Sequence, residues 1–427
     1  MKNTDHPDNR QALLPTADRK KLSIRTALLD IWLVFSAEVR RIFSDPMVML
    51  VFFIATLLYP LIFCSVYYKE TVINLPVAVV DDSDCEESHR FIYKLESTPE
   101  IEVAYHCCNL AEARYLMNNH RVHAIFYFPR DYGTRLASLR TARVAVMCDM
   151  SSFLYYKNAL LGGNDVLIDE MHTIELERYA LAGVTGQEAL DLVQPVAYDD
   201  VKLYNPAGGF SSFFLPALLM LIVHQTLFIG ILILCGDANE NRRALRLIPP
   251  HLRNHSIHRV TVGRALCFVL LYIPITLIDL WLIPHWFNMP QLGSLRHIML
   301  FLLPFILSVT FFGMSFGNFF VRQKMSGVLC CVFFSVILFF ISGMVWPQSN
   351  MPRFWYLFSY IFPSTPGIQG FVRLSTMGAT LAEVRHEYLT LWIQVLVYFC
   401  TACASLKFVS SKQTFSRHAK AHAGMSL

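Results

Sequence analysis

Charged residues are scarce in this sequence. Only 16% of its 427 residues are Asp, Glu, Lys or Arg, whereas 54% are hydrophobic. A soluble domain carries about 25% charged residues, so the composition argues against an ordinary soluble protein. The apolar residues gather in six runs, each about long enough to cross a hydrocarbon core of roughly 30 Å. These runs are Met47–Tyr67, Phe210–Cys235, Ala265–Phe287, Ile298–Val321, Met325–Trp346 and Tyr388–Leu406.

The sequence also lacks two motifs that mark catalytic chains. It contains no G-x-x-x-x-G-K-[ST] phosphate loop and no H-E-x-x-H. We therefore expect that the chain is not an enzyme, that it carries no cofactor and that it does not hydrolyse ATP by itself. The predicted class is a polytopic α-helical membrane protein.

The distribution of positive charge predicts the orientation of the spans. Residues 1–46 hold 8 Lys and Arg and the 236–264 loop holds 6, whereas the loop at 288–297 holds 1. Because Lys and Arg accumulate in cytoplasmic loops, both termini are expected in the cytoplasm. Residues 68–209 then lie outside, with 21 acidic and 12 basic residues, a net charge of −9.

One apolar segment is broken by prolines. "SGMVWPQSNMPRFWYLFSYIFPSTPGIQG" (342–370) is uncharged from Phe354 onward. If it crossed the membrane, there would be seven spans and the basic tail would lie outside. We therefore predict a re-entrant segment at 352–372, made of two half-helices broken at Pro363–Pro366, as a candidate outer gate. The alternative is a helix pair lying on the outer surface. The candidate gate residues are Pro347, Pro352, Pro363 and Pro366.

The region between the first two spans alternates between strand and helix patterns, which predicts an α/β extracytoplasmic domain. The predicted strands are 75–82, 102–106, 122–128 and 142–149, and the predicted helices are 84–96, 109–119, 129–139 and 153–181. An extended stretch should then lead back to the membrane. Before the first span, residues 23–44 have the apolar spacing of a helix lying on the membrane surface.

The predicted external domain contains three groups that invite a functional reading. Asp81, Asp82 and Asp84 follow a strand and precede a helix, where capping is favoured over cation binding. His120 and His123 lack further ligands at zinc spacing, so we expect a surface loop and no metal site. Four cysteines lie in this domain, where disulfides form in an oxidising compartment, and all three pairings stay open. They are Cys85, Cys107, Cys108 and Cys148.

Three polar residues fall within predicted spans and are possible pathway residues. A carboxyl such as Asp279 is costly within a membrane unless it is paired or wet, so it is a functional candidate by default. Pairing with nearby His285 is the alternative. His224 and Gln225 lie mid-span, where such side chains either line a pathway or bond a neighbouring helix.

Four stretches together resemble the permease subunits of bacterial type-2 ABC transporters, particularly exporters with a large external domain. "RRIFSDPMVML" resembles the interfacial helix that enters the first span, and "LPVAVVDDSD" resembles the first strand of the external domain. "LYNPAGGFSSFFLPALL" resembles its return to the membrane. "SGMVWPQSNMPRFWYLFSYIFPSTPGIQGFVR" resembles the end of the fifth span and the re-entrant segment. The resemblance covers about residues 20–410.

The loop between the second and third spans departs from this pattern. "ENRRALRLIPPHLRNHSIHRVTVGRAL" keeps Glu240 and a Gly263-Arg264 pair but lacks the Gly-Thr of the family. By resemblance, this loop (236–264) contacts the ATPase through a short helix beginning near Asp237. The expected coupling residues are Glu240, Arg242, Arg243 and Arg246.

The resemblance implies an exporter permease of the bacterial inner membrane that moves an amphipathic or lipid-like substrate. The implied partners are a separate ATPase that binds the ATP, a second permease, identical or related, a periplasmic adaptor and membrane lipid, but no nucleic acid. The alternatives are a secondary transporter with Asp279 as its ion site, or a receptor or scaffold whose external domain binds a protein. The predicted segments are a cytoplasmic N-terminal segment (1–46), the first span (47–67), the external domain (68–209), five further spans (210–408) and a cytoplasmic tail (409–427).

Overall fold

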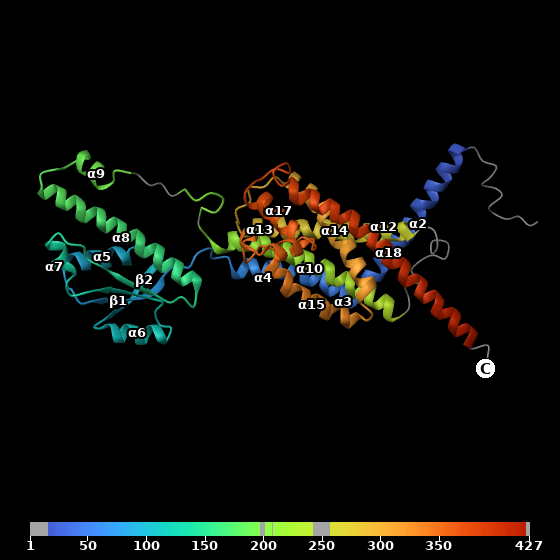
Figure 1. The fold of residues 1–427 in the computed structure, drawn as a ribbon, viewed down its shortest axis with the longest axis horizontal. Coiled ribbons are helices and arrows are strands. Elements are labelled where there is room, and N and C mark those ends of the chain that lie inside the picture. Colours follow the sequence, from blue (N-terminus) through green and yellow to red (C-terminus); the bar gives the residue numbers. More distant parts are fainter. Residues whose placement is uncertain (1–15, 197–200, 207, 242–256, 424–427) are drawn as a thin grey trace, which may run out of the picture. The chain divides into compact units, whose positions relative to one another are not determined.

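The computed structural model describes residues 16–196, 201–206, 208–241 and 257–423. It divides the chain into two units. Met1–Tyr68 and Leu203–Leu427 form the first, which we call the helical unit, and Lys69–Lys202 form the second, the α/β unit (Figure 1). Each unit has its own hydrophobic core.

Among the described residues, the helical unit has six helices that are long and apolar enough to cross a membrane. They run over Pro46–Val66, Phe210–Glu240 (α10), Ile257–Trp286, Leu295–Phe320 (α14), Lys324–Ile341 (α15) and Arg385–Ser411. The first comprises α3 (Pro46–Met49), the π-helical η1 (Leu50–Ala55) and α4 (Thr56–Val66). The third comprises α12 (Ile257–Leu277), the π-helical η3 (Ile278–Leu282) and α13 (Ile283–Trp286). The sixth is the apolar part of α18 (Arg385–Ala423).

Helix α10 is the most buried of the six. It packs against α14, α15, α4 and α17 (Ser364–Thr376). Its sequence is apolar on all sides, as is typical of a helix enclosed by others. Phe228 lies at its centre, with ring centroids 5.3 Å from Phe312 of α14 and 6.3 Å from Phe334 of α15. The core of the helical unit is therefore built around α10.

Several helix ends differ from the apolar runs, and three of them have a clear physical reason. The second helix continues beyond Cys235 to Glu240, and the third begins at Ile257, before the expected Ala265. Both extensions contain charged residues whose partners lie on other helices, which a hydropathy pattern cannot detect. The fifth ends at Ile341, before Trp346, because Gly343 adopts a left-handed conformation with φ 84° that terminates the helix.

The N-terminal helix α2 (Thr16–Ser44) buries two acidic residues against the rest of the helical unit, whereas its Arg25 and Arg40 are exposed. Asp30 and Glu38 are buried, whereas Leu28, Trp32 and Leu33 are each more than half exposed. This arrangement is the reverse of a soluble amphipathic helix, and it suits a helix whose outer face lies in lipid.

The α/β unit contains a four-stranded sheet in the order β2-β1-β3-β4. Its strands are β1 (Leu75–Asp81), β2 (Ile101–Cys107), β3 (Ala124–Phe128) and β4 (Ala145–Cys148). Strand β1 is parallel to β2 and β3, with Val79 opposite Phe126, while β4 is antiparallel to β3. The alternating strands and helices of the sequence predicted this class of sheet.

Helices cover both faces of the sheet (Figure 1). Leu75, Val77 and Val79 of β1 share a core with α5 (Glu86–Glu96) and α8 (Phe153–Leu181). Ala78 and Val80 face the opposite core, which contains residues of α6 (Leu110–Asn118). Burial on both faces explains why β1 reads as a continuous apolar run.

Two short helices complete the α/β unit. Helix α7 (Tyr132–Ala137) follows β3. Helix α9 (Gln187–Val193) lies within the stretch after α8. The sequence predicted that stretch as extended, so the expectation is wrong for these seven residues.

Candidate functional site

Buried and half-buried charged side chains join four helices at the end of the helical unit where α2 lies. We call Glu38, Arg41, Asp45, Asp237, Arg264 and Lys324 the inner charge network. They come from α2, the residue that caps the first span, and the ends of α10, α12 and α15. The network includes both helices that flank residues 242–256.

Helix α2 is joined to α12 through Glu38. Its Oε1 lies 3.0 Å from Nη2 of Arg264 and 3.6 Å from Nη1 of Arg41. A close approach of the helices makes this pairing possible, because a Cβ at Gly263 would lie 2.8 Å from the backbone oxygen of Ile31. The Gly263-Arg264 pair thus supplies the space and the partner for Glu38.

Burial alone would disfavour the ionised form of Glu38, which is 2% exposed. The charges and hydrogen bonds of Arg264 and Arg41 outweigh that penalty and hold the pKa of Glu38 below its ordinary value. Removing one member of such a buried pair typically costs about 3–5 kcal/mol. Glu38 therefore acts as a charged fastener between α2 and α12.

Asp237 extends the network to α10 and α15. Its Oδ2 lies 3.4 Å from Nη2 of Arg41, and its Oδ1 lies 3.7 Å from Nζ of Lys324. Lys324 also pairs with Asp45, whose side chain accepts a hydrogen bond from the amide of Met47 and so caps the first span. One carboxylate of α10 thus connects two other helices, α2 and α15.

The structure corrects the expected coupling helix. Asp237 lies within the last turn of α10 and is 9% exposed, so no separate helix begins there. Glu240 is the exposed last residue of α10, and its Oε2 accepts a hydrogen bond of 3.2 Å from the backbone amide of Lys324. Glu240 therefore caps the start of α15. The other three predicted coupling residues, Arg242, Arg243 and Arg246, lie outside the described residues.

The four gate prolines all stand at helix starts, where a missing amide hydrogen is tolerated. Pro347 precedes the short η4 (Gln348–Asn350), and Pro352 precedes α16 (Arg353–Ser359). Pro363 caps α17, and Pro366 lies within its first turn. The break between the half-helices falls at residues 360–363, slightly before the predicted Pro363–Pro366.

Helix α18 satisfies the backbone of this break. Nε2 of Gln394 donates to the oxygen of Tyr360 at 2.7 Å, and the Tyr398 hydroxyl donates to the oxygen of Ile361. Gln394 in turn accepts a hydrogen bond of 3.1 Å from Ser308 of α14. Gln394 and Tyr398 lie nine and thirteen residues beyond Arg385, about 14 and 20 Å along the helix. The break is thus level with the middle of the sixth apolar helix.

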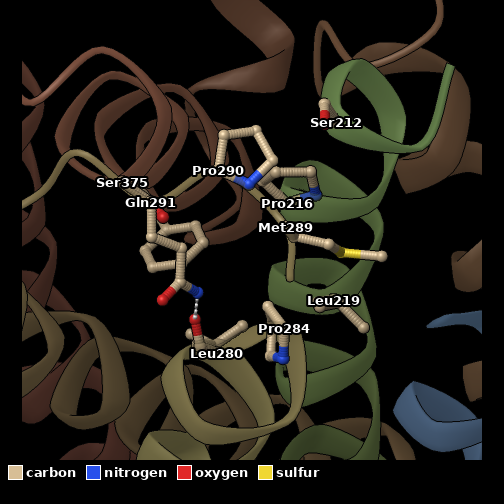
Figure 2. A pocket seen from close by; sticks show the side chains of 10 residues that line it. Ser212, Pro216, Leu219, Leu280, Pro284, Met289, Pro290, Gln291 and Ser375 are labelled. Atoms are coloured by element: carbon tan, nitrogen blue, oxygen red, sulfur yellow. Dashed lines mark hydrogen bonds between the residues drawn. The ribbon is translucent and has the colours of Figure 1, made fainter. Parts of the chain in front are cut away.

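A cluster of prolines lies where the start of α10 meets the end of the third apolar helix. Figure 2 shows Pro216 of α10, Pro284 of α13 and Pro290 around a small cavity. Pro284 has no amide hydrogen for the oxygen of Leu280, and Nε2 of Gln291 donates to that oxygen instead, at 3.2 Å. The cavity is about 10 Å³, far below the roughly 300–1,000 Å³ of small-molecule sites. It is therefore a packing gap rather than a substrate site.

The predicted pathway residues face different neighbours. His224 is fully buried against Phe228 and Phe305, and neither ring nitrogen is bonded to a described residue. The Oε1 atom of Gln225 instead accepts a hydrogen bond of 3.2 Å from Cys331 of α15. His224 thus lies in an aromatic environment, whereas the adjacent Gln225 bonds a neighbouring helix, α15.

Asp279 lies in the π-helical segment η3 and is fully buried. Neither of its carboxylate oxygens is hydrogen-bonded to a described residue. The alternative that it pairs with His285 is wrong, because His285 stacks on Trp281 at 5.7 Å and forms no ion pair with Asp279. An unpaired carboxyl inside an apolar helix remains a functional candidate.

Comparison with known families gives a match over most of the chain. A family model described as ABC-2 family transporter protein matches residues 47–404. The chain belongs to the ABC-2 transporter family. A comparison with curated proteins gives no significant match. The family and the six apolar helices identify a multi-pass membrane protein and the permease component of an ABC transporter.

In this ABC-2 permease, the groups singled out in the α/β unit have structural roles. Asp81 accepts hydrogen bonds from the amides of Ser83 and Asp84, in the turn between β1 and α5, and from the Ser88 hydroxyl. The expected capping of the helix by these aspartates is wrong, because Cys85 occupies the N-cap position of α5. His123 packs against Tyr155, with ring centroids 4.0 Å apart and the rings tilted by 32°. No group of three metal-ligating side chains occurs among the described residues.

The four cysteines of the α/β unit carry free thiols, so the structure contains none of the three possible disulfide pairings. Cys85 instead caps α5, with its sulfur accepting from the amide of Ser88 at 3.4 Å. Burial raises the pKa of the Cys107 and Cys148 thiols, which keeps both protonated.

Most residues of the inner charge network were not identified as functional candidates from the sequence. Glu38 and Arg264 belong to different segments, and neither carries a motif of its own. The available signal was the charged residue at position 38 of a helix predicted to lie on lipid, together with an arginine directly after Gly263. Neither residue predicts its partner without the packing of α2 on α12.

Proposed function

We propose that this permease is half of an exporter that moves an amphipathic small molecule or lipid-like substrate across the bacterial inner membrane. A separate ATPase subunit binds and hydrolyses the ATP, and a second permease, identical or related, completes the translocation unit. The family membership supports the transporter class. The apolar helices and the absence of catalytic motifs agree with this division of labour.

The inner charge network is the observation that carries the ATPase coupling. It joins α2, α10, α12 and α15, and two of these helices, α10 and α12, flank residues 242–256. A movement of residues 242–256 by the ATPase would therefore displace four helices together instead of bending a single helix. Its end of the unit is cytoplasmic in our proposal, together with both termini, while the α/β unit lies outside and is available to a periplasmic adaptor.

The segment at 352–372 is a re-entrant outer gate in this proposal. The carbonyl oxygens at its break are bonded by Gln394 and Tyr398, about 14–20 Å along α18. A helix pair lying on the outer surface would leave those carbonyls to water. Bonding by side chains of a membrane helix is what non-helical backbone at membrane depth requires.

Substitution of Glu240 tests the ATPase contact. Because Glu240 also caps α15, Glu240→Ala is compared with Glu240→Gln, which keeps an oxygen acceptor but removes the charge. A double change of Arg242 and Arg243 to Gln tests the basic side of the loop. We expect normal insertion, with ATPase association weakened by about 2–5 kcal/mol in Glu240→Ala and Glu240→Gln.

Co-purification of the full-length permease with its ATPase gives the association, and substrate-stimulated ATP hydrolysis gives the coupling. A loss in Glu240→Ala alone would assign Glu240 only to capping of α15. Unchanged association and coupling in all three variants would place the ATPase contact elsewhere.

A further inference from the structure

A cavity in the α/β unit lies between α7, α8 and the loop that joins α7 to β4. Its volume is about 520 Å³, within the range of about 300–1,000 Å³ that small-molecule sites occupy. Its apolar lining includes Leu136 and Leu139 on one side and Leu167, Met171 and Ile174 of α8 on the other. This lining would accept a hydrocarbon chain.

Arginines add a positive charge to this cavity. Arg140, Arg143 and Arg178 all line it, although acidic residues outnumber basic ones by nine in the region 68–209. Arg140 and Arg143 are exposed, and neither side chain forms an ion pair or hydrogen bond with a described residue. Two guanidinium groups are thus free to bind an anion.

The acidic residues of the lining do not cancel this charge. Glu170 is 1% exposed, and its carboxylate is paired with Arg90 at 2.7 Å and with Lys94 at 2.9 Å. These cations belong to α5 and do not line the cavity, and they neutralise the charge of Glu170. The other acidic lining residue is Glu175, so the three arginines leave a surplus of positive charge.

Arg143 also lines a second, polar cavity of about 220 Å³, together with Pro129, Asp131 and Arg135. Asp131 is already paired with Arg135. The apolar cavity and the polar one therefore share Arg143, which places an anion-binding group where a hydrocarbon lining gives way to a polar one.

We propose that this cavity binds an amphipathic anion, with a hydrocarbon chain against α8 and a carboxylate or phosphate head group at Arg140 and Arg143. Guanidinium groups bind both head groups through paired hydrogen bonds. The ligand is thus either a free fatty acid or an anionic phospholipid. The site lies outside the membrane helices and does not depend on the ATPase contact or on the direction of transport.

Photocrosslinking of the full-length protein in nanodiscs tests the site. The probes are a diazirine-bearing C16 fatty acid, a diazirine-bearing phosphatidylglycerol, and the methyl ester of the same fatty acid as a neutral control. We expect an anionic probe to label peptides containing residues 136–144 and 167–174, and the ester to label them at least tenfold less. The probe that labels identifies the source of the head group.

The double variant Arg140→Gln/Arg143→Gln should lower this labelling at least tenfold. The matched control Arg114→Gln/Arg121→Gln removes two exposed arginines of the same unit that do not line the cavity, and it should label like the wild type. Competition by unlabelled fatty acids should strengthen by up to about fourfold per added methylene.

Equal labelling by the ester, labelling that survives Arg140→Gln/Arg143→Gln, or labelling confined to other peptides would overturn the proposal. An Ile174→Trp variant, which fills the cavity without changing charge, gives an independent test. It should block the anionic probes, and undiminished labelling in a folded Ile174→Trp protein would also contradict the site.

Discussion

At the end of the helical unit where α2 lies, ion pairs join the helices. Toward the opposite end, the helices are joined mainly by hydrogen bonds from neutral amides and hydroxyls, and prolines begin several of them. Glu38 and Asp237 are each paired with two cations at the first end. From the middle of the unit to its other end, Gln394, Tyr398 and Gln291 each donate to a backbone oxygen. The single ion pair described there is Arg373 with Glu387, at 3.0 Å.

This difference bears on which end can rearrange. Breaking one partner of a buried ion pair costs about 3–5 kcal/mol, whereas an unsatisfied neutral group costs about 1–3 kcal/mol. The charged end should therefore move as one body with α2. The neutral end should open at lower cost, which is what an outer gate requires.

Labelling from the two sides of the membrane gives the largest expected effect, because it is all or none. In our proposal, Ser349 lies outside and Ser411 lies inside. Cysteines introduced at these exposed positions should react with an impermeant thiol reagent from opposite sides. The free cysteines of the chain are a background, so the unmodified protein is the control. Reaction of both sites from outside would make the proline segment a seventh span and remove the re-entrant gate.

Glu38→Gln should produce the largest loss of stability. It leaves Arg264 buried beside a neutral amide, so we expect a loss of about 3–5 kcal/mol in the free energy of unfolding. The thermal unfolding of the detergent-solubilised protein measures it. Glu102→Gln, at an exposed position, is the control for loss of a carboxylate. Replacing both partners, Glu38→Met with Arg264→Met, should recover much of the loss, and equal stability of Glu38→Gln and Glu102→Gln would contradict the network.

The pH dependence of the unfolding free energy of Glu38→Gln, compared with that of the wild type, tests the role of the Glu38 charge. Because the pKa of Glu38 is held below its ordinary value of 4.5, its ionisation stabilises the fold fully above that value. The contribution is lost as the pH falls through the lowered pKa of the folded state. The stability gap between wild type and Glu38→Gln should thus be constant from pH 7 to about 5 and narrow below 4. A gap that widens on acidification would assign the effect to another group.

Tyr398→Phe should have a smaller effect at the neutral end. It removes only the hydroxyl that bonds Ile361, so we expect a loss of about 1–3 kcal/mol in the free energy of unfolding. Tyr388→Phe in the same helix is the matched control, because the Tyr388 hydroxyl has no hydrogen bond to a described residue. Thermal unfolding and substrate transport are measured for both. Identical behaviour of the two variants would mean that the break does not depend on α18.

Asp279→Asn should have the smallest effect. Its carboxyl has no ion pair to lose, so unfolding should change by less than about 1 kcal/mol, and ATP-driven transport should remain largely intact. Asp237→Asn, which removes a carboxylate with two cationic partners, is the matched contrast and should be more damaging. Complete loss of transport in a stable Asp279→Asn protein would favour the ion-coupled alternative.

The sequence by itself determined the elements and their order. Six apolar runs, strand and helix periodicities and helix-breaking prolines are local properties, and they located α8 and the strands to within a few residues. The same local signals missed α9 and the charged extensions of α10 and α12. The charged residues of those extensions are paired with Asp30, Glu38 and Lys324, which lie in distant segments of the sequence.

Only the tertiary structure decided what those charges do. An ion pair between Glu38 and Arg264 depends on the packing of two helices more than 200 residues apart, and no local pattern records it. The same holds for Glu240, whose bond to the start of α15 requires two helix ends to meet. Local periodicity fixes helices because hydrogen bonding within a helix is local, whereas charge pairing across helices depends on how they pack.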